Sequence, residues 1–185
     1  MHTRELAHVS PLLTAGLPLT RSALKFAKER YGGDVQHPLE VAAELRHAGC
    51  PDEVVASGVL HDVLETTDTD VNELTERFGK HVARLVQAVS EDASIEDGEE
   101  RKAALRAQVA RARREAAIVF AADKVSRVRE LPTRVDRGLS PDDARRKLDH
   151  YHASLVMLQR RLGRAHPLVQ QLGVELDRVD AGVRM

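Results

Sequence analysis

The stretch Val54-Val55-Ala56-Ser57-Gly58-Val59-Leu60-His61-Asp62-Val63-Leu64-Glu65 is apolar on nearly every side of a helix and carries a histidine and an aspartate near its end. Apolar residues all round are typical of a helix buried at the centre of a domain. Burying an imidazole and a carboxylate without a metal ion or a hydrogen-bonding partner would cost several kcal/mol. The stretch therefore predicts a central helix with a polar site in the core.

Helical signals continue on both sides of this stretch, and strand signals are missing. Thr20 is a candidate N-cap, the Gly32-Gly33 pair a helix stop, and Pro38 suits the first turn of a helix. The predicted fold class is all-α. We expect helices over residues 21–31, 38–49, 51–64, 70–78, 81–89, 101–114, 116–131 (ending before Pro132), 141–162 and from 167 onward, with polar loops at 66–70 and 91–99.

Composition indicates one domain in a reducing compartment. The chain has 185 residues, is 42% hydrophobic and carries a formal net charge of −1, so no global field favours nucleic acid. Cys50 is the only cysteine, which suits the cytoplasm, and the polar stretch 1–5 lacks a signal-peptide core. No apolar run approaches the ~18 residues of a membrane span. We expect a single domain over 1–185, with a core at about 20–132 and C-terminal helices at about 140–182.

Two more residues join His61 and Asp62 as candidate metal ligands. His37 precedes Pro38 at a helix start, and Asp123 lies in the apolar segment around Ala122. Two imidazoles and two carboxylates suit a divalent cation of intermediate hardness such as Mn²⁺ or Fe²⁺. Adjacent helical residues diverge by about 100°, so His61 and Asp62 can share an ion only if it lies between their directions.

These residues occur in a pattern that resembles a known family, the HD-domain phosphohydrolases. Within that family the chain is most similar to the hydrolase half of RelA/SpoT proteins and to the stand-alone small alarmone hydrolases. The similarity runs from about Ala23 to Leu131. It is carried by His37-Pro38-Leu39-Glu40-Val41-Ala42, Gly58-Val59-Leu60-His61-Asp62-Val63-Leu64-Glu65, Phe78-Gly79 and Ala122-Asp123-Lys124.

The resemblance implies an all-α helical bundle around a central metal site. It implies Mn²⁺ as the ion, although the same ligands would accept Fe²⁺ or Zn²⁺. The implied activity is hydrolysis of a nucleotide-type phosphate or pyrophosphate, and the first substrate to test is the stringent-response alarmone guanosine 3′,5′-bis(diphosphate), attacked at its 3′-pyrophosphate. The implied partner is that small molecule, with neither nucleic acid nor membrane. The implied roles are metal binding for His37, His61, Asp62 and Asp123, catalysis for Glu65 and Asp62, and phosphate binding for Lys124 and Arg127.

Three departures from the alarmone-hydrolase pattern leave alternatives open. Thr66 stands where the family has an aspartate that serves the attacking water, and Arg127 stands where it has an asparagine near the nucleotide sugar. The basic loop before the first histidine ligand is shortened to residues 31–36. The chain is then either a hydrolase or a binding or regulatory module that has lost turnover. A third alternative is a structural domain in which His61 and Asp62 pair internally.

Overall fold

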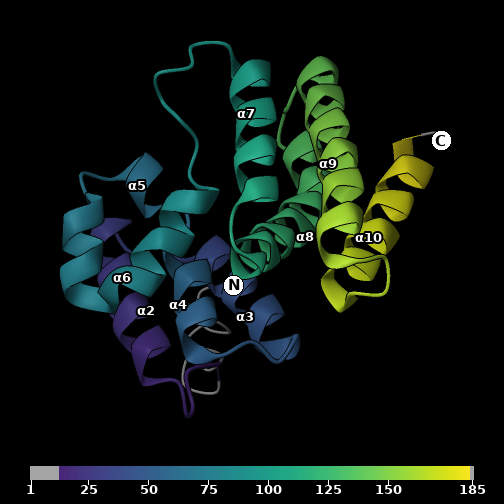
Figure 1. Ribbon diagram of the computed structural model, residues 1–185. Helices are drawn as coiled ribbons and strands as arrows, with labels where there is room; N and C mark the ends of the chain where they lie inside the picture. Colours follow the sequence, from purple (N-terminus) through teal and green to yellow (C-terminus); the bar gives the residue numbers. More distant parts are fainter. Residues whose placement is uncertain (1–12, 184–185) are drawn as a thin grey trace. The chain divides into compact units, whose positions relative to one another are not determined.

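The computed structural model describes residues 13–183, and every regular element in that range is a helix (Figure 1). The predicted all-α class is therefore confirmed for the described residues, and none of their helices is long and apolar enough to cross a bilayer. The polar N-terminal stretch 1–5 lies outside the described range. The helices are α2 (Pro18–Arg30), α3 (Gln36–His47), α4 (Asp52–Leu60), α5 (Val63–Thr66), α6 (Val71–Val89), α7 (Gly98–Arg111), α8 (Arg114–Asp136), α9 (Pro141–Leu162) and α10 (Pro167–Val183).

The helices divide into two compact units. The N-terminal unit contains α2 to α6 and ends at Glu91, and the C-terminal unit begins at Asp92 and contains α7 to α10. Each unit has its own buried apolar residues, such as Leu45 and Leu60 in the first and Phe120 and Leu158 in the second.

In the N-terminal unit α4 is the central helix, as its composition predicts. It packs against α2, α3 and α6, and all seven residues from Val54 to Leu60 are buried. Its first turn also holds α2 in place, because the Asp52 carboxylate accepts the backbone N–H groups of Leu19 and Thr20, each at 2.8 Å. The predicted N-cap role of Thr20 is thus wrong: α2 begins at Pro18, and a carboxylate from another helix satisfies the N–H groups of its first turn.

The predicted central helix is interrupted at its functional end. It ends at Leu60, and the carbonyl of Asp62 opens a new short helix, α5, by accepting the N–H groups of Glu65 and Thr66. Asp62 itself has φ −93° and ψ −3°, in the sparsely populated region between helix and strand. The expectation of one helix through Leu64 is therefore wrong, because a turn at His61 and Asp62 separates α4 from α5.

Two other predicted helices are joined into α6 across a sharp bend. Asp70 caps the start of α6 by accepting the N–H of Glu73 at 2.8 Å. Gly79, inside α6, has φ 84° and ψ 160°, a conformation that a residue with a Cβ rarely adopts. The break predicted at this glycine is confirmed.

In the C-terminal unit α8 packs against α9 and α10, and α7 packs against α9. The prediction that the helix around Asp123 ends before Pro132 is wrong, because α8 continues through this proline to Asp136. A proline inside a helix removes one backbone hydrogen bond. Leu131 is buried and α8 packs along α10, so tertiary packing outweighs that local cost.

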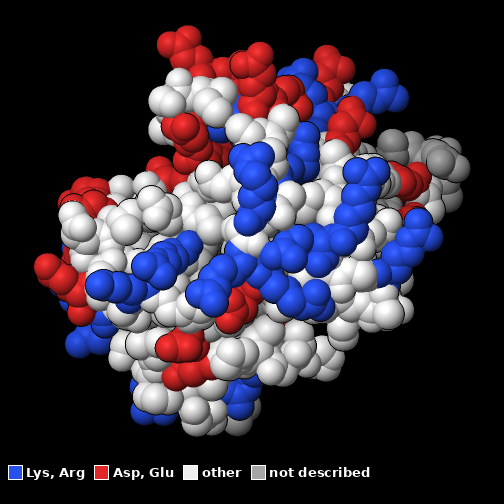
Figure 2. Space-filling model, viewed as in Figure 1, with Lys and Arg blue, Asp and Glu red and all other residues white. Residues whose placement is uncertain are grey.

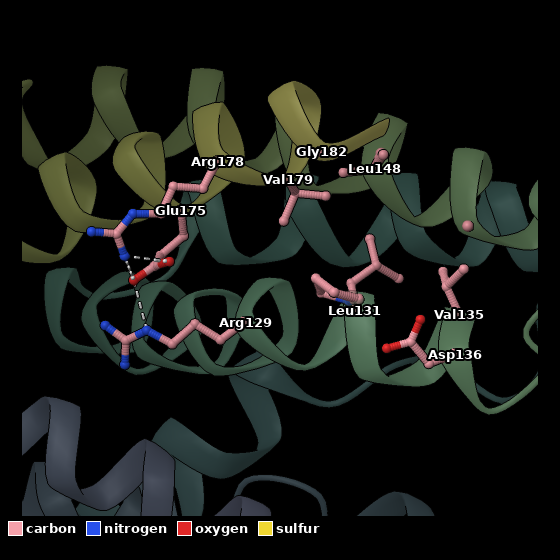
Figure 3. Close-up of a pocket in the computed structure, with 11 residues that line it drawn as sticks. Arg129, Leu131, Val135, Asp136, Leu148, Glu175, Arg178, Val179 and Gly182 are labelled. Atoms are coloured by element: carbon pink, nitrogen blue, oxygen red, sulfur yellow. Dashed lines mark hydrogen bonds and ion pairs between the residues drawn. The ribbon is translucent and has the colours of Figure 1, made fainter. Parts of the chain in front are cut away.

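A pocket of about 430 Å³ lies among α8, α9 and α10 (Figure 3). Its walls are apolar at Leu131 and Val179, and Glu175 of α10 marks one end. The Glu175 carboxylate accepts Nε of Arg129 at 2.7 Å and Nη1 of Arg178 at 3.2 Å. The first of these ion pairs joins α10 to α8 beside the pocket.

The close approach of α3 to α4 depends on Gly58. A Cβ at this position would lie 2.3 Å from Cδ1 of Leu45 and 3.2 Å from Cγ1 of Val41, both fully buried side chains of α3. We predict that Gly58→Ala lowers the free energy of unfolding by about 1–3 kcal/mol, because these side chains must leave their packed positions.

Urea unfolding measures this change, and Gly173→Ala in α10 is the matched control. At Gly173 the nearest side-chain atom would be Cδ2 of Leu155, at an ordinary 4.0 Å. The control variant should gain about 0.5–1 kcal/mol from the lower backbone entropy of its unfolded chain. Equal effects of the two substitutions would contradict the packing argument.

Candidate metal centre

His61 lies in the turn after α4, buried and with its ring orientation fixed. Its Nδ1 atom is 2.8 Å from the carbonyl oxygen of Gly58. A carbonyl oxygen only accepts hydrogen bonds, so Nδ1 carries a proton and the neutral ring presents a lone pair at Nε2. A backbone carbonyl on the second ring nitrogen is a common arrangement around metal-binding histidines.

The Nε2 atom of His61 lies close to a nitrogen and an oxygen of two other candidate ligands. Nε2 of His37 lies 3.2 Å away, and Oδ1 of Asp62 lies 3.1 Å away. Electron-rich atoms converge at such distances when a positive charge, a metal ion or a proton, lies among them. Imidazole nitrogen with carboxylate oxygen suits a divalent transition metal, so these three residues fit the ion that the sequence implies.

Glu65 lies on α5, one turn after this histidine pair. Its Oε1 accepts the backbone N–H of Glu91, just beyond the end of α6, at 2.8 Å. The surrounding protein withdraws water from the carboxyl and raises the pKa of Glu65, although the residue as a whole is exposed. The hydrogen bond from Glu91 opposes that shift, and the negative charge of Asp62 adds to it. The result is an anchored carboxylate with raised proton affinity, which suits a general base.

The residues next to Glu65 do not supply a second acid. The Thr66 hydroxyl donates to the carbonyl of Asp62 at 2.8 Å, which ties it to its own helix. Asp68 is paired with Arg30 of α2 at 2.8 Å, and Asp70 caps α6. Neither Asp68 nor Asp70 therefore replaces the aspartate that alarmone hydrolases carry at the position of Thr66.

Asp123 lies on α8 in the C-terminal unit, buried between two cations. Nζ of Lys124 is 2.6 Å from one of its carboxylate oxygens, and Nε of Arg127 is 3.3 Å from the other. The Lys124 ammonium also lies over the ring of Phe120, 4.4 Å from its centroid. Arg127 therefore bonds to Asp123 itself, one helical turn away, which fixes the cation beside the carboxylate.

The structure groups the sequence-predicted residues within each unit. His37, His61 and Asp62 come together in the N-terminal unit, with Glu65 anchored on the next turn. Asp123, Lys124 and Arg127 come together in the C-terminal unit, where both cations pair with the carboxylate.

One further buried titratable group, His150, lies in the C-terminal unit outside the set of residues that the sequence singles out. His150 of α9 is buried, and its Nδ1 contacts Nη1 of Arg106 of α7. Burial, followed by the charges of Lys124 and Arg106, lowers its pKa to about 2. His150 is therefore neutral, and no local sequence signal distinguishes it from a surface histidine.

Comparison with known proteins identifies a family over most of the chain. The family model described as HD domain matches residues 19–164. This range includes most of each unit and every candidate site residue named in this subsection.

Curated relatives match over shorter stretches. The chain is 41% identical over 81 residues to the guanosine-3′,5′-bis(diphosphate) 3′-pyrophosphohydrolase of Aquifex aeolicus, covering 40% of this chain and 12% of that protein. It is 39% identical over 102 residues to the enzyme of that name, MESH1, from Danio rerio, and 36% over 99 residues to human MESH1. The two MESH1 matches each cover 52% of this chain, and it spans about half of their length, 54% and 55%.

Solved structures share the fold. A metazoan SpoT orthologue that hydrolyses ppGpp superimposes with a TM-score of 0.76 at 21% identity, covering 87% of this chain and 95% of the other. The lmo0812 protein from Listeria monocytogenes gives 0.69 at 24% identity, covering 79% and 96%. The chain therefore shares its fold with these two proteins.

The neutral state of His150 predicts an acid-sensitive fold. Its pKa is about 2 in the folded chain against an ordinary 6.5, so between these values the unfolded chain binds the extra proton. Stability from this residue is complete above pH 6.5 and is lost as the pH falls, by about 1.4 kcal/mol per pH unit.

Urea unfolding of the wild type and of His150→Gln at several pH values between about 7 and 5 measures this loss. The glutamine variant does not titrate, so its stability should fall less steeply as the solution is acidified. Parallel pH profiles for the two proteins would show that His150 is not held neutral.

Proposed function

Since this chain belongs to the HD domain family, we propose that it is a metal-dependent phosphohydrolase acting on a nucleotide-type phosphate or pyrophosphate. The proposed substrate is guanosine 3′,5′-bis(diphosphate), which loses its 3′-pyrophosphate. The observation that carries the proposal is the lone pair of His61 Nε2, which faces Nε2 of His37 and a carboxylate oxygen of Asp62. The names of the curated relatives support the substrate.

The proposed metal ligands are His37, His61, Asp62 and Asp123. Nε2 of His61 lies 3.2 Å from Nε2 of His37 and 3.1 Å from a carboxylate oxygen of Asp62. Asp123 would add a second carboxylate, a ligand of the same chemistry as Asp62. A carboxylate offers about four acceptor positions, so the contacts of Asp123 with Lys124 and Arg127 leave room for a further bond. The proposed ion is Mn²⁺, and Fe²⁺ and Zn²⁺ suit the same donors.

The chain's own groups would perform the remaining steps. A bound divalent ion would acidify a water molecule and polarise a phosphoryl oxygen. Glu65 would orient that water and take its proton as the oxygen attacks phosphorus and a P–O bond breaks. Lys124 and Arg127 would neutralise the charge that develops on the phosphate oxygens.

The proposal extends to the organisation of the chain and its place in the cell. We propose that both units form one HD domain, with a core at about 20–132 and C-terminal helices at about 140–182. The family match over residues 19–164 supports this, because it runs across both. The proposed place of the chain is the cytoplasm, and the single cysteine suits that reducing compartment.

The first test is metal binding. We predict that the purified chain, reloaded with Mn²⁺, binds the metal stoichiometrically and that His37→Ala loses it, because one of the facing ring nitrogens is removed. His47→Ala changes an exposed histidine of the same helix and should keep the metal. Metal analysis of the wild type, His37→Ala and His47→Ala measures the bound Mn²⁺. A His37→Ala protein that binds as much Mn²⁺ as the wild type would overturn the proposed ligand set.

The second test is turnover of guanosine 3′,5′-bis(diphosphate) by the Mn²⁺-loaded chain, with Asp62→Ala as the blank. We predict that Glu65→Gln lowers kcat by about 10²–10⁴ while the metal content stays unchanged, because the glutamine amide cannot take the proton. Glu76→Gln, at an exposed position of α6, is the matched control. A Glu65→Gln protein with wild-type kcat would remove Glu65 from the mechanism.

The alternative of a binding module without turnover rests on Thr66, whose hydroxyl is bonded to its own helix. If the missing acid limits the reaction, Thr66→Asp raises kcat in a protein with unchanged metal content. A wild type that matches the Asp62→Ala blank on the alarmone and on common nucleotides, together with an inactive Thr66→Asp protein, would leave the binding module as the function.

A further inference from the structure

We propose that the C-terminal unit carries a second anion site, built by Lys102 and Arg106 of α7 and Lys147 of α9, which binds a diphosphate group. These three residues are called the basic cluster below. In the proposed substrate this group would be the diphosphate that is not removed, and that assignment rests on the proposed function. The binding of a diphosphate to the basic cluster is independent of the proposed function.

The contact of Arg106 with His150 brings the cluster together. This contact joins α7 to α9, which pack against each other. Lys102 precedes Arg106 by one helical turn, and Lys147 precedes His150 by one turn, so each pair lies on one helix face. The two faces meet at the Arg106–His150 contact, and cations from both helices therefore gather there.

The partner of Arg106 is neutral, which leaves its charge uncompensated. His150 accepts a hydrogen bond from the guanidinium and carries no charge of its own. Burial lowers the pKa of Arg106, and Glu99 opposes the shift without forming an ion pair with it. A carboxylate in place of His150 would fix Arg106 equally well, but it would also cancel the charge.

The other cations of the cluster crowd each other. Burial and the charges of Arg134, Lys102 and Arg127 lower the pKa of Lys147, and the charge of Asp143 only partly offsets them. Asp143 is itself paired with Arg146 at 2.6 Å, and Glu99 pairs with Lys102 at 3.3 Å. Among the described residues, neither Arg106 nor Lys147 has a carboxylate within ion-pair distance. The cluster thus keeps at least two positive charges that the protein does not neutralise.

The surface view agrees with this arrangement. Figure 2 shows Lys and Arg side chains gathered over the region where α7, α8 and α9 lie in Figure 1. A set of half-buried cations is unlike an ordinary solvated helix face, where each charge extends into water and interacts weakly. Holding like charges together costs free energy, and an anion that spans them recovers it.

The number of donors and charges in the basic cluster favours a diphosphate over a smaller anion. A guanidinium offers several donors in one plane and each ammonium adds a point charge, so the site rewards an anion with many oxygens and several charges. A diphosphate group has both properties. Inorganic pyrophosphate is therefore the probe, with inorganic phosphate as the smaller anion and GDP as the nucleotide that carries the same group.

The binding test uses the full chain without metal, so that it is independent of turnover. After treatment with EDTA and dialysis at low ionic strength, calorimetry measures pyrophosphate binding to the wild type and to Arg106→Gln and Lys147→Gln. Each variant should bind at least about tenfold more weakly, since each loses one charge-assisted hydrogen bond. Arg145→Gln, an exposed cation two residues from Lys147, is the matched control and should bind as the wild type does.

The role of His150 is tested by two substitutions. His150→Phe keeps a ring but removes the acceptor and should weaken pyrophosphate binding to the level of Arg106→Gln. His150→Gln restores a neutral acceptor and should recover most of the affinity, with thermal unfolding confirming that both variants fold. If His150→Phe does not fold, the pyrophosphate affinities of His150→Gln and Arg106→Gln are compared instead. Binding by His150→Gln as weak as that of Arg106→Gln would contradict the role of a neutral acceptor at this position.

The outcomes separate this inference from the proposed function. Equal binding by the wild type, Arg106→Gln and Arg145→Gln, or phosphate bound as tightly as pyrophosphate, would overturn the basic cluster as a diphosphate site. Pyrophosphate binding without any alarmone hydrolysis would support the cluster and reject the proposed function. If hydrolysis occurs, Arg106→Gln should raise KM for the alarmone more than it lowers kcat, and the reverse would contradict its assignment to substrate binding.

Discussion

The hydrogen bond between Nδ1 of His61 and the carbonyl of Gly58 is the interaction on which the candidate metal centre depends. It fixes the tautomer and rotation of a buried ring, and it does so at the one residue of α4 that has no side chain. The same missing side chain lets Leu45 of α3 pack against α4. Because α3 also carries His37, the packing that stabilises the N-terminal unit brings the second imidazole to the first.

The ionisable groups of both units are held by specific partners before any substrate arrives. Glu65 is held by the N–H of Glu91, and Asp123 by Lys124 and Arg127. Groups fixed in this way need little reorganisation during a reaction, which is the main source of electrostatic catalysis. Arg127, which departs from the alarmone-hydrolase pattern, is fixed on Asp123 itself. This contact places the positive charge at the carboxylate and not in open solvent.

Periodicity and capping residues were enough to predict the elements whose stability is local or simply apolar. The buried helix α4 and the break at Gly79 follow from these rules. The turn at Asp62 and the passage of α8 through Pro132 do not follow from them. At Pro132 the reason is packing, because α8 lies along α10, which is distant in sequence. The contact between Arg106 and His150 spans 44 residues, and no local pattern encodes it.

The two buried histidines, His61 and His150, each form a hydrogen bond with a partner that fixes an orientation, but one donates and the other accepts. His61 donates to a neutral carbonyl, so its ring is oriented with Nε2 toward His37 and Asp62, the candidate ligands of a cation. His150 accepts from Arg106, so the guanidinium is oriented while its positive charge stays available for an anion. In both cases the orienting partner is neutral. A charged partner would give the same geometry, but its charge would pair with the oriented group. The bound cation or anion would then have to compete with that partner.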